Sequence, residues 1–269
     1  MSINSNVKAW ILSVGNELLI GRIVNTNASW IAKRLTFLGV TVTRIITVPD
    51  IIDDIVEEID RGLKYSNIII TTGGLGPTYD DKTLEAVAKA VKRKLVLNKD
   101  ALKMISAKFS KGNLPMTKER EKMAYLPEGA IPLKNSVGTA PGSFLELDGK
   151  ILISLPGVPK EMEAIFEEEL IEKIKKITPP ISVVECGFKV EGVPESSIAP
   201  ILEQIDKKFS NLYIKSHPKG IEVGGPILEI KVLASDKEEN KAREKAESAL
   251  KIAKEQAEKL KGKISEEYC

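Results

Sequence analysis

The chain has 269 residues, and 42% of them are hydrophobic, which is enough for a packed core in one large domain or two moderate ones. Its 40 Lys and Arg residues nearly balance 38 Asp and Glu residues, so the formal net charge is only +2. This balance gives no argument for a surface built to bind nucleic acid or an anionic membrane, and we expect neither as a partner.

Rare residue types limit the chemistry further. Two cysteines, Cys186 and Cys269, are too few for a disulfide scaffold, so we expect reduced, cytoplasmic thiols and a mobile Cys269 at the end of the chain. A single histidine, His217, excludes a multi-histidine metal site, so any metal ion is expected to be hard and oxygen-bound, such as magnesium. No signal-peptide pattern or apolar run of membrane-spanning length is present.

The first part of the chain alternates between strand and helix patterns. Val7–Val14 predicts a strand that ends in a polar turn, and Asn25–Gly39 predicts a helix. Thr41–Val48 predicts a second strand, and Ile52–Leu63 a second helix. This alternation is typical of a parallel sheet with helices on both faces, in which ligands bind beyond the carboxyl ends of the strands.

A glycine loop follows the next strand. Ile68–Ile70 is a β-branched run that predicts a central strand, buried on both faces. Gly73, Gly74 and Gly76 follow at once, and a helical pattern starts near Asp81. A strand, a glycine turn and a helix start together predict an anion cradle, because free backbone N–H groups point out of the turn.

Carboxylates lie at the same predicted sheet edge. Asp80 and Asp81 end the glycine loop, Glu17 follows the first strand, and Asp50 follows the second. Carboxylates repel phosphate, and a divalent cation between the two would remove the conflict. The alternative is that Glu17 is a solvated turn residue, that Asp50 is a helix cap, and that Asp80 or Asp81 caps the helix after the loop.

The middle of the chain carries an excursion and a second turn. Thr83–Lys92 continues the helix, and Ala101–Lys122 predicts a broken, lysine-rich helical excursion that is either a lid over the site or a solvated helix pair. Asn135–Gly142 is a second glycine loop, and Asp148-Gly149 predicts a hairpin. Its second arm runs into Pro156–Pro159, after which another helix begins at the same edge.

Thr178-Pro179-Pro180 predicts a domain boundary, because two prolines end a helix and stiffen a linker. We therefore expect one α/β domain over residues 1–177 and a small α+β domain over residues 178–269. The second domain reads as strand, helix, strand, strand and helix, a βαββα order, with its last helix over Lys237–Lys261. Alanines form one stripe along that helix, which is typical of a helix lying on a small sheet.

Four strings carry a family resemblance: SVGNELLIGRIVNTN (Ser13–Asn27), TTGGLGPTYDD (Thr71–Asp81), NSVGTAPG (Asn135–Gly142) and LPGVPKEM (Leu155–Met162). Together they resemble the CinA family and, more broadly, the molybdopterin-binding domain of MogA- and MoaB-type proteins. The resemblance covers about residues 7–177, and the second domain resembles the middle domain of CinA. It implies an α/β fold with three α/β/α layers and a mostly parallel sheet.

The resemblance also implies an activity. The resemblance to this branch of CinA-like proteins implies a metal-dependent pyrophosphatase that hydrolyses ADP-ribose or a related nucleotide diphosphate. The implied cofactor is Mg²⁺, Mn²⁺ or Co²⁺, with a monovalent cation as a further candidate, and the implied assembly is a cytoplasmic homodimer. Longer CinA proteins carry an amidase domain, but this chain stops at Cys269, so we do not expect that activity.

MogA-type relatives use two acidic residues in magnesium-dependent adenylyl transfer, and these match Asp81 and Asp50. Their loop has a basic residue where this chain has Asp80, which favours metal binding and weakens the adenylyl-transfer reading. Two alternatives stay open. One is a protein of molybdenum cofactor biosynthesis that either binds a pterin or nucleotide as a module or resembles an adenylyltransferase. The other is an interaction or structural protein.

These arguments predict a set of site residues. Asp81, Asp50, Asp80 and Glu17 are the candidate catalytic residues, and the first three are the candidate metal ligands. The candidate substrate-binding residues are Gly73, Gly74, Leu75, Gly76, Thr78, Asn25, Asn27, Gly138, Thr139, Pro156 and Gly157.

Overall fold

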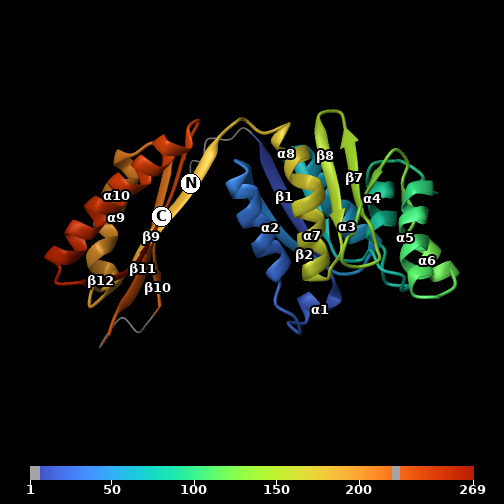
Figure 1. The fold of residues 1–269 in the computed structure, drawn as a ribbon, viewed down its shortest axis with the longest axis horizontal. Helices are drawn as coiled ribbons and strands as arrows, with labels where there is room; N and C mark the ends of the chain where they lie inside the picture. The colour runs from blue at the N-terminus through green and yellow to red at the C-terminus, as the bar shows by residue number, and fades with distance from the viewer. Residues whose placement is uncertain (1–6, 220–224) are drawn as a thin grey trace. The chain divides into compact units, whose positions relative to one another are not determined.

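The computed structural model describes residues 7–219 and 225–269, so the first six residues of the predicted first domain lie outside the described part. Contacts divide the described chain into two compact units (Figure 1). One unit contains Val7–Leu35 and Thr41–Ile177, and the other contains Thr178–Cys269 together with Thr36–Val40.

A six-stranded sheet forms the centre of the first unit, in the order β2-β1-β3-β8-β7-β6. The first four strands in this order are parallel to one another. β7 runs antiparallel to β8, and β6 runs antiparallel to β7. The bounds are β1 Lys8–Val14, β2 Thr41–Val48, β3 Ile68–Thr72, β6 Ile131–Leu133, β7 Gly142–Leu147 and β8 Lys150–Leu155. All five residues of β3 are buried between β1 and β8, which confirms the predicted central strand.

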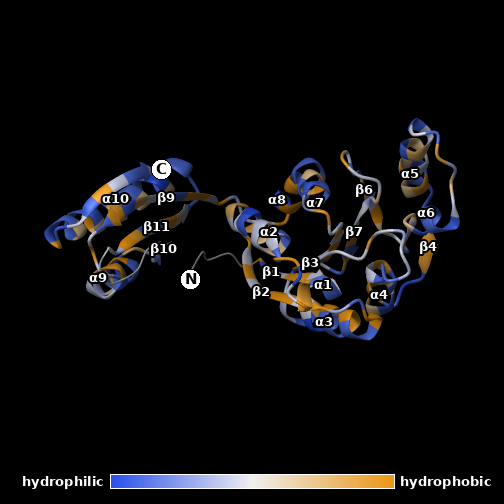
Figure 2. Ribbon diagram, turned by 90° about the horizontal axis from the view of Figure 1, so that it is seen from below, coloured by the Kyte–Doolittle hydropathy of each residue, from blue (hydrophilic) through white to orange (hydrophobic). Residues whose placement is uncertain are grey.

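Helices cover both faces of this sheet (Figure 2). α2 (Thr26–Phe37), α7 (Pro159–Ile165) and α8 (Ile171–Lys175) lie on one face, whereas α3 (Ile52–Tyr65) and α4 (Thr83–Ala90) lie on the other. A π-helical turn, Phe166–Leu170, joins α7 to α8, and the Phe166 ring packs edge-on against Trp30 of α2 at 5.3 Å. The predicted three-layer α/β/α arrangement with a mostly parallel sheet is confirmed.

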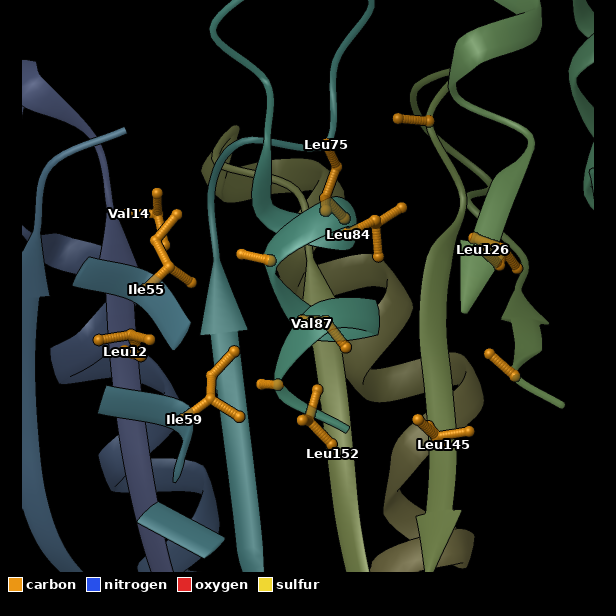
Figure 3. Packing of buried hydrophobic residues seen from close by; sticks show 14 of the residues in the cluster. Leu12, Val14, Ile55, Ile59, Leu75, Leu84, Val87, Leu126, Leu145 and Leu152 are labelled. Carbon is orange, nitrogen blue, oxygen red and sulfur yellow. The ribbon is translucent and has the colours of Figure 1, made fainter. Parts of the chain in front are cut away.

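The core between the sheet and α3 and α4 is aliphatic (Figure 3). Ile55 and Ile59 are fully buried, and their spacing of four residues places both on the inner face of α3. They pack in one cluster with Leu12 of β1, Val87 of α4 and Leu152 of β8. This cluster holds the strands in register and so fixes where their carboxyl ends lie.

Several short elements were not predicted. α1 (Asn16–Leu19) lies in the predicted polar turn after β1, and β5 (Tyr125–Pro127) pairs with β4 (Leu95–Leu97). The excursion consists of two separate helices, α5 (Lys99–Lys111) and α6 (Lys118–Lys122), so the predicted break in its helical pattern is present. The hairpin between β7 and β8 forms as predicted, with Asp148 and Gly149 both at positive φ.

The second unit contains a four-stranded antiparallel sheet, in the order β10-β11-β9-β12. Its elements are β9 Ser182–Glu191, α9 Glu195–Lys208, β10 Leu212–Pro218, β11 Ile227–Asp236, α10 Glu239–Lys259 and β12 Lys263–Tyr268. The order is therefore βαββαβ, and the predicted βαββα order was wrong in lacking β12. The alanine stripe of α10 is buried as predicted, at Ala242, Ala246, Ala249, Ala253 and Ala257.

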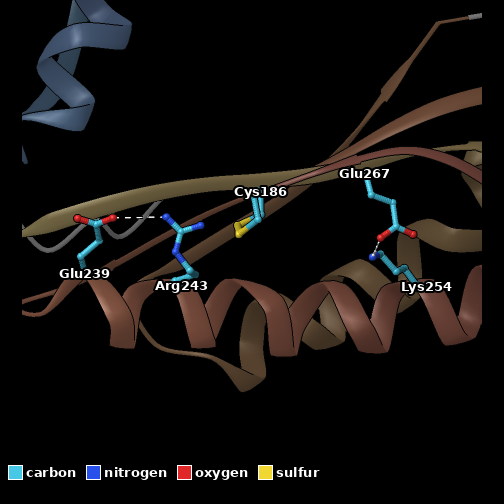
Figure 4. Close-up of a disulfide and its surroundings, with 6 residues drawn as sticks. Cys186, Glu239, Arg243, Lys254 and Glu267 are labelled. Carbon is cyan, nitrogen blue, oxygen red and sulfur yellow. Dashed lines mark hydrogen bonds and ion pairs between the residues drawn. A yellow bond between two sulfur atoms is a disulfide. The ribbon is translucent and has the colours of Figure 1, made fainter.

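A disulfide joins Cys186 of β9 to Cys269 (Figure 4). The expectation of reduced thiols and a mobile terminal cysteine was therefore wrong. β12 runs back along β9 and pairs Tyr268 with Gly187, which brings the next residue, Cys269, alongside Cys186. Without β12 in the prediction, nothing in the sequence placed the two cysteines together.

Within the residues that the structure describes, no helix has the length and apolar character needed to cross a membrane.

Candidate functional site

The carboxyl ends of the four parallel strands open into one cavity of about 420 Å³, here called the carboxylate pocket. It brings together Glu17 after β1, Asp50 after β2, Asp81 after β3 and Gly157 after β8. This is the arrangement expected of a parallel sheet, where ligands bind beyond the strand ends. Its walls also include the predicted residues Gly73, Gly74, Leu75, Gly76, Thr78, Asp80, Thr139 and Pro156.

The glycine loop after β3 needs its glycines at two positions. Gly73 has φ 103° and Gly74 has φ 67°, a left-handed backbone that other residues rarely adopt. A side chain at Gly73 would meet the carbonyl oxygen of Val14, and one at Gly74 would meet the hydroxyl of Thr83. The loop therefore packs backbone to backbone at the floor of the carboxylate pocket.

Hydrogen bonds fix this loop in place. The Thr83 hydroxyl donates to the Gly73 carbonyl at 2.8 Å, and the Gly73 N–H donates to the Leu155 carbonyl at 3.0 Å. We expected the backbone N–H groups of the glycine loop to be free for a ligand, and this is wrong for the N–H of Gly73. Within the described chain, the N–H groups of Gly74, Leu75 and Gly76 have no hydrogen-bond partner. These three amides are the available anion donors.

Thr78 brings the two loop carboxylates together. Its hydroxyl lies 2.5 Å from Asp80 Oδ1 and also contacts Asp81 Oδ2, and its N–H donates to Asp81 Oδ2 at 2.8 Å. α4 begins without a side-chain cap, so the alternative that Asp80 or Asp81 only caps this helix is wrong. The hydrogen bond from Thr78, with help from the Asp80 backbone and from nearby lysines, lowers the pKa of Asp80 below its ordinary value.

Asp50 and Glu17 enter the carboxylate pocket from β2 and α1. Asp50 Oδ2 accepts the backbone N–H of Asn16 at 2.9 Å, at the start of α1. The helix that follows Asp50, α3, begins without a side-chain cap, so the alternative that Asp50 caps that helix is wrong. The Glu17 carboxylate folds back over Gly15, where it leaves no room for a side chain. Both carboxylates nevertheless line the pocket.

A fifth carboxylate, Glu161, was missed from the sequence. It lies in the first turn of α7, and the Asn135 side-chain amide donates to Glu161 Oε2 at 2.7 Å. Asn135 Oδ1 accepts the backbone N–H groups of Val137 at 3.1 Å and Gly138 at 2.6 Å. Gly138 does not line the pocket; instead, its missing side chain makes room for the Glu161 carboxylate. The signal was an acidic residue placed two residues after Pro159, in the first turn of the predicted helix.

The charge of the carboxylate pocket is one-sided. Its walls carry five carboxylates, and in the described part of the chain no Lys, Arg or His joins them. No group of three or more Asp, Glu, His or Cys side chains among residues 7–219 and 225–269 is arranged to hold a metal ion, so Asp50 does not form one ligand set with Asp80 and Asp81. The pair joined by Thr78 still fits Mg²⁺, which commonly takes one or two carboxylates plus phosphate oxygens.

Asn25 and Asn27 lie outside the carboxylate pocket. The Asn25 amide donates to Ser13 Oγ at 2.8 Å, and its oxygen accepts the Ala28 N–H at 3.2 Å at the start of α2. The Asn27 amide donates to Thr72 Oγ1 at 3.0 Å and to the Gly157 carbonyl at 2.9 Å. Both side chains therefore tie α2 to the strand ends, rather than pointing free hydrogen-bond donors at the phosphate site.

The predicted excursion touches the site through α6 and the residue after it. Lys122 Nζ donates to the Thr78 carbonyl, and Met123 lines the carboxylate pocket. These contacts join α6 to the glycine loop, while its action as a lid stays a prediction.

The chain has relatives along nearly its whole length. Residues 10–176 match a family model described as "Probable molybdopterin binding domain". A protein of Aeropyrum pernix is 52% identical over 260 residues, 97% of each chain, and one of Pyrobaculum calidifontis is 49% identical over 243 residues, 90% of this chain and 93% of that one. The crystal structure of CinA from Thermoplasma acidophilum, titled as of unknown function, is 43% identical with a TM-score of 0.59, covering 62% of this chain and 98% of that one.

Proposed function

The chain belongs to the family described as "Probable molybdopterin binding domain", and from this premise we propose that its carboxylate pocket binds a nucleotide diphosphate and hydrolyses the pyrophosphate bond. ADP-ribose is the favoured substrate, giving AMP and ribose 5-phosphate. In this reaction a water oxygen bonds to one phosphorus, the bridging phosphorus–oxygen bond breaks, and the leaving phosphate keeps the bonding electrons. The water proton passes to a carboxylate.

One observation carries this proposal: three free backbone amides and five carboxylates share one pocket. Each pair of unit charges at 4 Å repels by about 1 kcal/mol even in water, so a diphosphate and these carboxylates need a cation between them. A bound divalent cation would supply that neutralisation and would polarise the phosphate oxygens. The donor set that fits it is the Asp80 and Asp81 pair joined by Thr78.

The residues of the chain have distinct roles in this proposal. The amides of Gly74, Leu75 and Gly76 donate to phosphate oxygens, as free amides of a glycine turn do. Thr78 holds the Asp80 carboxylate ionised by lowering its pKa. Glu17 or Asp80 orients the attacking water and takes its proton, since no histidine lines the described pocket and carboxylates are the available bases.

The test is incubation of the purified protein with ADP-ribose and a panel of nucleotide diphosphates, each with Mg²⁺, Mn²⁺ or Co²⁺, followed by analysis of phosphate products. Asp81→Asn is expected to lower turnover by about two orders of magnitude or more, with an unchanged melting temperature. Asp100→Asn is the matched control, because this exposed carboxylate on α5 lies outside the pocket. Metal-dependent turnover that survives in Asp81→Asn would remove Asp81 from the mechanism.

A second candidate function is binding or adenylyl transfer in molybdenum cofactor biosynthesis. It is favoured by the description of the matching family and by the position of Asp81 and Asp50 at the ends of β3 and β2. Thermal-shift measurements separate the two candidates, because ligand binding without turnover raises the melting temperature and forms no product. The cytoplasmic homodimer stays a prediction.

A further inference from the structure

The carboxylate pocket has an apolar neighbour in the same unit. A second cavity, of about 270 Å³, shares Val14, Glu17, Gly73, Gly157 and Val158 with it. We call this second cavity the apolar pocket. Its outer wall is formed by the segment that follows α1, including Leu18, Ile23 and Val24. The shared residues mean that a single ligand can extend from one pocket into the other.

Asn25 and Asn27, two polar side chains of the apolar pocket, already have partners. Asn25 bonds to Ser13 Oγ and to the Ala28 N–H, and the Asn27 amide N–H groups bond to Thr72 and Gly157. These groups hold the wall together, so they do not need a ligand. One exception is Asn27 Oδ1, which is buried and lacks a hydrogen-bond partner within residues 7–219 and 225–269. Because this oxygen has almost no accessible surface, a ligand in the pocket does not reach it.

Apart from Thr26, Thr72 and Glu17, the remaining side chains of the pocket wall are apolar, and three of them are unusually exposed. Val24 is 80% exposed, Ile23 is 55% exposed and Val158 is 54% exposed, although all three line the pocket. Glu17 lines both pockets and is the charged side chain of the described apolar pocket. Among the described residues, no Lys, Arg or His side chain lines this pocket. Such walls favour an uncharged group with apolar faces, because charged groups would lose solvation there without gaining a partner.

We propose that the apolar pocket holds the base of the nucleotide while the diphosphate lies on the glycine loop, an inference that rests on the proposed function. Of the parts of a nucleotide, the base is the uncharged one with two apolar faces. The sugar hydroxyls and the phosphates lack such faces. These faces match the apolar side chains of Ile23, Val24 and Val158. The structure thereby assigns a nucleotide substrate rather than an inorganic or purely sugar diphosphate.

The experiment compares ADP with inorganic pyrophosphate by titration calorimetry, each with Mg²⁺. The variants are the native protein, the double variant Ile23→Ser/Val24→Ser and the control Ile20→Ser. Ile20 is 74% exposed on the same segment and lines neither pocket, so it reports any general effect of removing an aliphatic side chain there. The double variant is expected to bind ADP about tenfold more weakly and pyrophosphate within about twofold of the native protein. The control should match the native protein with both ligands.

Two outcomes overturn the inference in different ways. The base does not occupy the apolar pocket if native protein binds ADP no more tightly than pyrophosphate. The same follows if the double variant loses affinity for both ligands equally, or for neither. In these cases the proposed diphosphate site on the glycine loop still stands. If native protein binds neither ligand, the proposed function fails together with the inference. Circular dichroism of the variants shows whether the fold is kept, which is expected because both substituted residues are exposed.

Discussion

Reduction of the disulfide between Cys186 and Cys269 is predicted to release β12 from the sheet of the second unit. β12 is an edge strand that pairs on one side with β9, and its ladder is interrupted between Ser265 and Tyr268. Exposed ion pairs, such as Lys189 with Glu266 at 2.5 Å, also join it to the sheet, but such pairs contribute little. The covalent bond is therefore the main restraint on the end of the chain.

The size of the effect follows from the length of the closed loop. The two cysteines are 83 residues apart, and the loop-closure entropy for that length corresponds to about 4.5 kcal/mol at 25 °C. For a domain of this size, about 1 kcal/mol shifts the melting temperature by roughly 4–8 °C, so the melting temperature of the second unit should fall by roughly 18–36 °C. This value is an upper expectation, because disulfides often stabilise by less than the entropy model gives.

The assay is scanning calorimetry of the native protein and of Cys269→Ser, each with and without a thiol-free phosphine reductant. The native protein should lose stability on reduction, and Cys269→Ser should melt like the reduced protein and ignore the reductant. Amide exchange over Lys263–Tyr268 should accelerate in both cases. If the unfolded native protein titrates two free thiols without reductant, or if reduction leaves its melting unchanged, the reasoning is refuted.

Three further predictions concern the carboxylate pocket. Gly73→Ala should lower the free energy of unfolding by about 3 kcal/mol or more in urea titrations, because its side chain would meet the Val14 backbone. The control Gly21→Ala, also at positive φ but in open space, should lower it by about 1 kcal/mol. Equal losses in the two variants would contradict this packing. Thr78→Val should raise the pKa of Asp80 toward its ordinary value in a carboxyl NMR titration. A lowered pKa contributes stability that is fully present above the unfolded pKa and is lost as pH falls through the folded pKa. The variant should therefore be less stable than the native protein at neutral pH, and this difference should disappear at acid pH. An unchanged pKa would mean that Thr78 does not hold Asp80. Glu161→Gln should keep the fold and lower turnover of ADP-ribose by about a hundredfold, and full turnover would place Glu161 outside the mechanism.

The sheet and its edge could be predicted because their signals are local. The β-branched runs of β2 and β3 and the glycines that follow β3 are contiguous in sequence. Parallel strands joined by helices must end at one edge, so the meeting of Glu17, Asp50 and Asp81 followed from topology alone. That argument needs no knowledge of side-chain conformations.

The missed features depend on contacts between distant residues. α1 has four residues, and its N-terminus is held by Asp50, which lies 34 residues further along the chain. A helix this short has no periodic pattern of its own to detect. Glu161 points into the pocket because Asn135 binds it and Gly138 leaves it room, and neither relation can be read from spacing.

The prediction for Asn25 and Asn27 shows the same limit. Amide side chains near a phosphate loop suggest ligand contacts, yet these two bond to Ser13 and Thr72 on β1 and β3. Their position in the sequence placed them near the strand ends correctly. Their partners depended on how α2 packs across those ends, which the residue pattern does not contain.

The absence of cations among the described walls of the carboxylate pocket also affects how fast a ligand reaches it. A free anionic nucleotide approaching five carboxylates is repelled, and its association rate should rise with ionic strength, the reverse of electrostatic steering. A nucleotide that arrives already complexed with a divalent cation carries less negative charge and meets a weaker barrier. Under the proposed function, this repulsion biases the order of arrival, and we expect ion and nucleotide to enter together as one complex.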